Sequence, residues 1–226
     1  MQRIKVEDLY EYRFLSEVTV SPDKAHVAFV VRQARSDGRG YQAGIYLLDT
    51  ANGSVRLLTG NGDEAVCRWV DDHTLVFPSS RAGDKAGSTA FYQLDIRGGE
   101  AQRTFTIPLS VKQFHLLPDG RWFVLSRQPI AKSDKQEDSR AQLGREYVVF
   151  DELPFWADGI GIINGLRMSG WLFDPKDGSI RKLTANTFDM EGAEVSPDGT
   201  RLLYWGVDYT DVRPDYKQLM LYDLVS

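Results

Sequence analysis

The feature that most constrains this chain is a pattern that occurs four times along it. Each copy is a turn carrying aspartate that runs into a short apolar segment: SPDKAHVAFVV (21–31), VDDHTLVFPSS (70–80), LPDGRWFVLSR (117–127) and SPDGTRLLYWG (196–206). Proline presets the backbone φ of such a turn, the aspartate carboxylate accepts hydrogen bonds from nearby backbone, and glycine tolerates positive φ. The apolar segment after each turn predicts a buried β-strand.

A second pattern follows the strand after each of the first three turns. The segments 43–59, 89–106 and 169–184 each read as strand, turn, strand, and their turns hold the hairpin pairs Asn52-Gly53, Gly98-Gly99 and Asp177-Gly178. With one further strand before each aspartate turn, a repeat contains about four strands. The intervals between the turns are 49, 47 and 79 residues, counted between Asp23, Asp72, Asp119 and Asp198. Four strands in about 40–50 residues is the unit of a β-propeller blade.

We therefore predict an all-β fold, a partial β-propeller of about four blades with four antiparallel strands each. The domain covers residues 1–226, with blades at roughly 14–60, 63–109, 111–189 and 190–226. The third repeat is longer than the others, which predicts a mostly non-strand insertion at 129–165. The fourth repeat reaches only its third strand, so we expect an incomplete blade and a chain that is part of a larger ring. A β-sandwich is the alternative, but a sandwich does not require this repeat.

Composition excludes several classes of function. A net charge of −5 argues against a nucleic-acid-binding protein, which is normally basic. The polar N-terminus indicates no signal peptide, and no apolar run approaches the length of a membrane span. Cys67 is the only cysteine, which fits a reducing compartment and predicts a cytoplasmic protein. The three histidines lie in different repeats without metal-ligand spacing, so we expect no metal and no cofactor.

Two stretches resemble a known family. DLYEYRFLSEVTVSPDKAHVAFVV (8–31) and FDELPFWADGIGIINGLRMSGWLFDPKDGSIRKLT (150–184) are similar to the propeller of prolyl oligopeptidase family serine peptidases, in the acylaminoacyl-peptidase and dipeptidyl-peptidase-like branch. The resemblance spans essentially the whole chain. It implies a propeller that gates and helps bind short peptide substrates. It also implies a partner, a C-terminal α/β-hydrolase domain with a Ser–Asp–His triad.

The catalytic part of that family is missing from these 226 residues. No serine has the Gly-x-Ser-x-Gly spacing of a nucleophile elbow. We therefore expect the chain to contain no catalytic residues and to be inactive alone. The alternative function is a stand-alone propeller module that binds other proteins. In either case, an open arc of blades exposes an apolar face, which predicts self-association.

Candidate site residues lie in FDELPFWADG (150–159). The resemblance implies that acids in a propeller insertion bind the free α-amino group of a substrate, and this makes Asp151 and Glu152 candidate substrate-binding residues. The alternative is that the two acids cap a short turn, while Phe155 and Trp156 anchor the insertion on its blade. In ADGIGIINGL, the spacing of Gly159, Gly161 and Gly165 does not fit a dinucleotide-binding motif and favours strand glycines close to a neighbouring blade.

Overall fold

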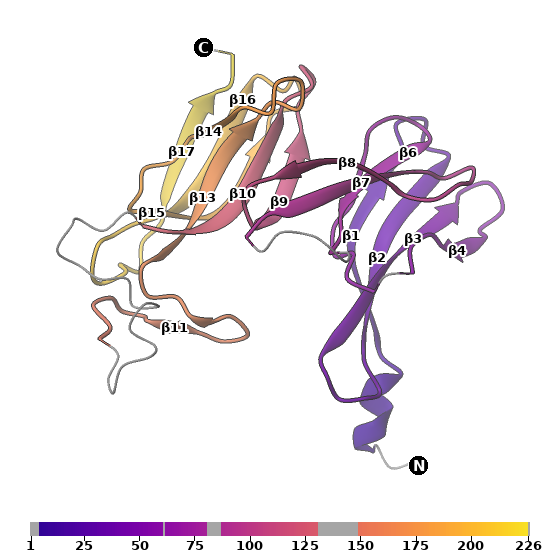
Figure 1. Cartoon of the computed structure of the whole chain (residues 1–226), viewed down its shortest axis with the longest axis horizontal. Helices are drawn as coiled ribbons and strands as arrows, with labels where there is room; N and C mark the ends of the chain where they lie inside the picture. Colours follow the sequence, from indigo (N-terminus) through magenta and orange to yellow (C-terminus); the bar gives the residue numbers. More distant parts are fainter. Residues whose placement is uncertain (1–4, 61, 81–86, 131–148, 226) are drawn as a thin grey trace. The chain divides into compact units, whose positions relative to one another are not determined.

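The computed structural model describes residues 5–60, 62–80, 87–130 and 149–225, and they form antiparallel sheets with one short 3-10 helix (Figure 1). The chain divides into two compact units, residues 1–109 and 110–226. Each unit contains two main sheets. Within the described ranges, no helix is long and apolar enough to cross a membrane.

The first unit begins with the 3-10 helix η1 (Val6–Tyr10) and builds two four-stranded sheets. Sequence neighbours pair in the order β1-β2-β3-β4 and β5-β6-β7-β8. The strands are β1 (Arg13–Val20), β2 (His26–Ala34), β3 (Tyr41–Asp49), β4 (Val55–Leu57), β5 (Arg68–Trp69), β6 (Thr74–Pro78), β7 (Thr89–Asp95) and β8 (Gln102–Ile107). Their core holds alternate residues of the inner strands, among them Val30, Ile45, Leu75 and Phe77, together with Cys67 just before β5. Alternation places these side chains on one face of each sheet.

The second unit has the same plan, interrupted by a small hairpin. Its main sheets run β14-β13-β10-β9 and β15-β16-β17, and β11 pairs with β12. The strands are β9 (Val111–Leu116), β10 (Trp122–Pro129), β11 (Trp156–Ala157), β12 (Gly161–Ile162), β13 (Leu166–Phe173), β14 (Ile180–Lys182), β15 (Phe188–Val195), β16 (Arg201–Asp208) and β17 (Gln218–Asp223). The core between its sheets includes Phe123, Leu125, Leu172, Met190 and Leu202.

The aspartate turns form as their residue types predict. In the first, the Asp23 carboxylate accepts hydrogen bonds from Ser21 Oγ at 2.6 Å and from the backbone N–H of Ala25 at 3.0 Å. In the last, Asp198 accepts from the Ser196 hydroxyl and from the Thr200 backbone N–H. These bonds favour the carboxylate form and lower the pKa of Asp198 to about 2.

The predicted all-β propeller-type fold is confirmed. There are four main antiparallel sheets, and each has one aspartate turn between its first two strands in chain order and the neighbour-to-neighbour pairing of a blade. The last sheet has three strands among the described residues. Within the predicted insertion, residues 131–148 lie outside the described ranges, and the remainder contains only the two-residue strands β11 and β12.

Candidate functional site

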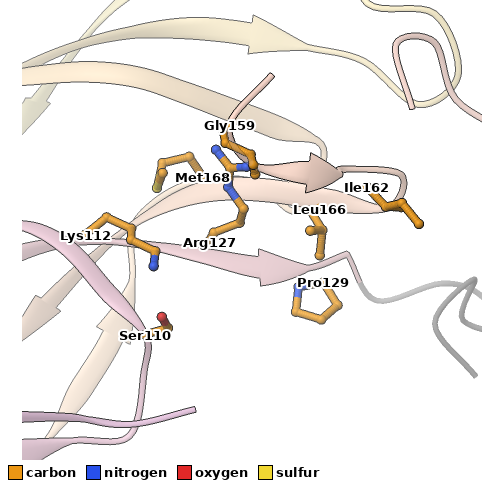
Figure 2. Close-up of a pocket in the computed structure, with 9 residues that line it drawn as sticks. Ser110, Lys112, Arg127, Pro129, Gly159, Ile162, Leu166 and Met168 are labelled. Carbon is orange, nitrogen blue, oxygen red and sulfur yellow. The ribbon is translucent and has the colours of Figure 1, made fainter. Parts of the chain in front are cut away.

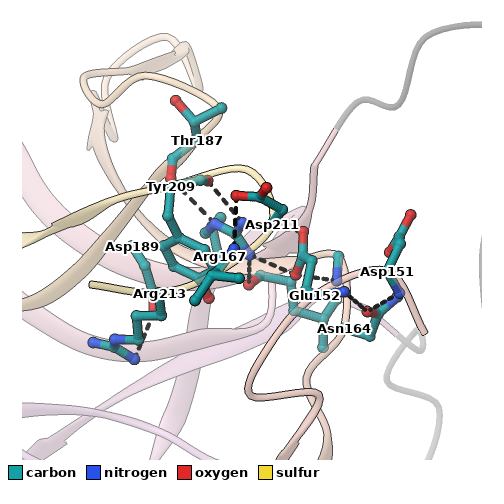
Figure 3. Close-up of polar contacts among 12 residues, drawn as sticks. Asp151, Glu152, Asn164, Arg167, Thr187, Asp189, Tyr209, Asp211 and Arg213 are labelled. Atoms are coloured by element: carbon teal, nitrogen blue, oxygen red, sulfur yellow. Dashed lines mark hydrogen bonds and ion pairs between the residues drawn. The ribbon is translucent and has the colours of Figure 1, made fainter. Parts of the chain in front are cut away.

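The candidate acid Glu152 lies in the interior of the second unit. Its carboxylate forms a two-pronged ion pair with Arg167 of β13, at 3.0 Å from Nη1 to Oε2 and 3.1 Å from Nη2 to Oε1 (Figure 3). Both side chains are 1% exposed. The backbone N–H of Gly165 also donates to Glu152 Oε2 at 2.7 Å. The planar guanidinium matches the two oxygens of a carboxylate, so this pair both neutralises the two buried charges and fixes the orientation of the two side chains.

Arg167 uses all of its donors. Besides the two bonds to Glu152, Nε donates to the Thr187 carbonyl at 3.1 Å, Nη1 to the Leu166 carbonyl at 2.9 Å and Nη2 to the Tyr209 carbonyl at 2.9 Å. The guanidinium also lies 3.6 Å from the centre of the Tyr209 ring. A buried charge is tolerated only when it is paired and its remaining hydrogens are satisfied. This cluster meets that condition.

The side chain of Asn164 forms hydrogen bonds with Asp151 and Glu152 at the other end of the segment that carries the two acids. Its Oδ1 accepts from the backbone N–H groups of Asp151 and Glu152 at 3.1 and 3.0 Å, and its Nδ2 donates to Asp151 Oδ1 at 3.0 Å. The start and the end of the 151–164 stretch are thereby tied together. A small hairpin, β11–β12, lies inside this closed segment.

The same segment is bonded to the loop between β16 and β17. Leu153 donates its N–H to the Asp211 carbonyl at 2.7 Å and accepts from the Arg213 N–H at 2.8 Å. Arg213 in turn forms an ion pair with Asp189 of β15 at 3.3 Å. Backbone pairing therefore holds the segment against the last sheet of its unit.

The four candidate residues, Asp151, Glu152, Phe155 and Trp156, differ in burial. Glu152 is buried, whereas Asp151 is exposed. Phe155 is 39% and Trp156 58% exposed, and the contact made by Phe155 is a stack on Phe150 with 4.6 Å between ring centres. Glu152 attaches the segment through its buried ion pair, whereas anchoring of the insertion by Phe155 and Trp156 stays a prediction. Contact of either acid with a substrate stays a prediction.

Sequence reasoning missed Arg167 and Asn164. The available signal was an arginine in GLRMSGWLF, a stretch that is otherwise apolar or small. A charged residue in a strand of that kind needs a buried partner of opposite charge.

A pocket of about 640 Å³ opens beside this segment, within the second unit (Figure 2). The polar groups on its wall are Ser110, Lys112 and Arg127, and neither Asp151 nor Glu152 lines it. The apolar wall comes from the end of β10, the start of β13 and the hairpin: Pro129, Leu166, Met168, Ile160 and Ile162. A volume of several hundred Å³ with an apolar wall and few polar groups is typical of a ligand site.

The glycines of the hairpin have a different role from the one predicted. Gly159 and Gly161 have φ values of +68° and +90°, which β-carbon-bearing residues rarely adopt. A β-carbon on Gly159 would meet nothing within 4 Å. Close approach of a neighbouring blade therefore does not explain Gly159. The tight turn of the β11–β12 hairpin, which carries one wall of the pocket, does.

Among the described residues, no group of His, Cys, Asp and Glu side chains gathers in a way that could hold a metal ion. The electrostatics of the site are those of the buried ion pair and of the two cations at the pocket. Burial also raises the pKa of the Tyr209 phenol, which lies against Arg167.

No protein-family model and no curated protein sequence matches this chain. Solved structures do match. Acylaminoacyl peptidase from Pyrococcus horikoshii is similar over 96% of this chain and 32% of its own, with a TM-score of 0.65 at 14% identity. TolB from Acinetobacter baumannii is similar over 95% of this chain and 42% of its own, with a TM-score of 0.56 at 16% identity. A puromycin-hydrolyzing peptidase from Mycobacterium tuberculosis matches over 93% and 27%, with a TM-score of 0.53 at 18% identity.

At 14–18% identity, these structural similarities show a shared fold. The predicted similarity to an acylaminoacyl-peptidase-type propeller is confirmed at that level. The chain spans about a third of the length of the first structure it matches.

Proposed function

We propose that this chain is the non-catalytic propeller segment of a serine peptidase, which works with an α/β-hydrolase domain of the same parent protein. The observation that carries the proposal is the likeness to an acylaminoacyl peptidase over 96% of this chain but only 32% of the peptidase. A match of that kind fits one part of a larger enzyme. In this role the propeller restricts access to the active site and helps to bind short peptides. The lone, fully buried thiol of Cys67 supports a reducing, cytoplasmic environment.

A fluorophosphonate probe tests this proposal, because it labels activated serine nucleophiles covalently. We expect the full gene product to be labelled and to hydrolyse short acylated peptides. The 226-residue chain alone should remain unlabelled, since none of its serines lies in a nucleophile elbow. Labelling of the 226-residue chain, or a full gene product with no reactive serine, would overturn the proposal.

The substrate role of the acids is tested in the same full-length enzyme. If Asp151 binds a free α-amino group, Asp151→Asn raises KM for free-amine peptides and leaves N-acetylated peptides unchanged. Glu152→Gln is the corresponding variant for the second acid, compared at a temperature where it remains folded. KM values for free-amine peptides that stay at the level of the unmutated enzyme in both variants would remove the acids from substrate binding.

The alternative is a stand-alone propeller that binds other proteins. The likeness to TolB, whose name carries no peptidase activity, favours it. Under this alternative the full gene product has no reactive serine, and affinity capture recovers a stoichiometric protein partner. The probe experiment therefore separates the two candidates.

A further inference from the structure

The pocket beside the β11–β12 hairpin has two cationic side chains, Arg127 and Lys112, in a largely apolar wall. The peptidase proposal assigns no role to them. Alternate residues of β10 lie on one face, so Phe123 and Leu125 of the core are followed on the same row by Arg127 and Pro129. Across the ladder, Met168 pairs with Arg127 and Leu166 with Pro129. The same face of β10 therefore contributes Phe123 and Leu125 to the core and the Arg127 guanidinium to the pocket wall.

The second cation comes from an irregularity in the neighbouring strand. In the pairing of β10 with β9, Leu125 lies opposite Gln113 and Ser126 opposite Val111, which leaves Lys112 as the extra residue of a bulge. Bulges redirect a side chain away from the regular alternation of a strand. Lys112 and Arg127 both line the pocket, and Figure 2 shows Arg127 extending from β10 toward Gly159 of the hairpin.

Neither cation is neutralised within the described part of the chain. No hydrogen bond or ion pair links the side chain of Lys112 or Arg127 to another described residue. By contrast, Arg35, Arg68, Arg97, Arg121, Arg167 and Arg213 all have acidic partners. Arg127 is half-buried at the wall of a cavity whose other members are largely apolar. Such an arrangement selects an anion that carries an apolar group next to its charge.

We propose that this pocket binds the C-terminal end of a peptide, with its carboxylate on Arg127 and Lys112 and its last apolar side chain against Leu166, Met168 and Ile162. A terminal residue carries its carboxylate and its side chain on the same carbon, which matches the spacing of charge and apolar wall. The inference rests on the proposed function, because it assigns to the propeller the end of the same short peptides. It goes further by naming the group that is recognised.

Binding is measured by titration calorimetry on the 226-residue chain, using acetyl-Leu-Phe with a free carboxylate and the same peptide as its amide. The acetyl group removes the amino charge, so the two ligands differ only at the carboxyl end. We expect the acid to bind at least about tenfold more tightly than the amide, because a charge-assisted bond is lost in the amide. Raising the salt concentration should weaken binding of the acid.

Single-residue variants test whether the peptide acid binds at Arg127 and Lys112. Arg127→Gln should weaken binding of the acid about tenfold or more, and Lys112→Gln, which changes an exposed side chain, should weaken it less. Arg39→Gln is the matched control, because Arg39 is an exposed arginine of the first unit that does not line the pocket. Melting curves confirm that each variant is folded.

Two further ligands test whether the pocket prefers a peptide carboxylate to other anions. Inorganic phosphate tests a bare anion and octanoate tests a fatty acid. Binding of either as tight as that of acetyl-Leu-Phe, equal affinity for the acid and the amide, or unchanged binding in both Arg127→Gln and Lys112→Gln would overturn the proposal. These outcomes concern this chain alone, so they are independent of whether the full gene product carries a reactive serine.

Discussion

At the scale of single residues, the buried ion pair between Glu152 and Arg167 has a measurable consequence for stability. Glu152→Gln keeps the size of the side chain but leaves the Arg167 guanidinium buried without a counter-charge. We expect the free energy of unfolding to fall by about 3–5 kcal/mol, the usual cost of breaking a buried ion pair. Urea denaturation followed by circular dichroism measures this loss.

The matched control is Glu194→Gln on β15, which makes the same chemical change at an exposed position. Its free energy of unfolding should change by no more than about 0.5 kcal/mol. A double variant, Glu152→Gln with Arg167→Met, should lose less than the sum of the two single variants, because each already disrupts the same pair. Strict additivity would contradict the coupling.

Cys67 is the second residue with a sharp chemical expectation. It is fully buried in the core of the first unit, and burial raises its pKa to about 12. Thiolate is the reactive form, so the native chain should react with Ellman's reagent very slowly at pH values near neutrality. Reaction should become fast in guanidinium chloride. Since the chain has one cysteine, the signal reports this residue alone, and rapid labelling of the native chain would show that the core is open.

At the scale of elements, the aspartate turns make stability depend on pH. The pKa of Asp198 is lowered from 3.8 to about 2, first by the Ser196 hydroxyl and then by Thr200. The pKa values of Asp23 and Asp119 are lowered as well, as is that of Asp71, which precedes Asp72 in the second turn and accepts the hydrogen bonds there. A folded pKa below the unfolded value gives stability that is fully present above the unfolded pKa. It is lost as pH falls from about 4 through the folded pKa.

We therefore expect the melting temperature to fall as the pH drops from about 4 to about 2, where these carboxylates become protonated. Asp198→Asn keeps the side-chain acceptor but cannot titrate, so the fall should be smaller in this variant. Scanning calorimetry across the pH series measures both. An identical pH profile for the variant would show that this turn does not contribute to the acid sensitivity.

These elements were predictable because their information is local. A proline, an aspartate and a glycine within four residues specify a turn, and Asn52-Gly53 or Asp177-Gly178 specifies a hairpin, whatever surrounds them. The site was not predictable in the same way. Glu152 lies 15 positions before its partner Arg167 and is buried with it, and Phe155 stays 39% exposed although its ring stacks on Phe150. Burial of this kind depends on tertiary packing, which a short motif does not encode.

At the scale of the whole molecule, one sheet face is apolar and exposed. On the last sheet, Leu203 lies opposite Leu221 and Trp205 opposite Leu219, so these side chains share a face. Leu219 and Leu221 are 67% and 64% exposed. Soluble proteins rarely leave a contiguous apolar face in water, so we expect the 226-residue chain to self-associate through it.

Sedimentation velocity tests this expectation over a range of protein concentrations. Leu219→Lys with Leu221→Lys should shift the chain toward the monomer, because a charge cannot be buried in an apolar contact without a partner. Val6→Lys is the control, since Val6 is an exposed apolar residue on η1, in the other unit. A parent chain that is strictly monomeric at all concentrations would refute the prediction.

The bond from Arg167 to the carbonyl of Tyr209 also bears on the order in which this chain acquires its structure during synthesis. The two residues are 42 positions apart, so the guanidinium emerges from the ribosome well before its last acceptor. At about 5–20 residues per second, the wait is on the order of a few seconds. During that interval Glu152 and Arg167 can meet, but the β16–β17 loop that holds their segment does not yet exist. We therefore expect the hairpin wall of the pocket to be fixed only after the β16–β17 loop has formed, although its own residues are made earlier.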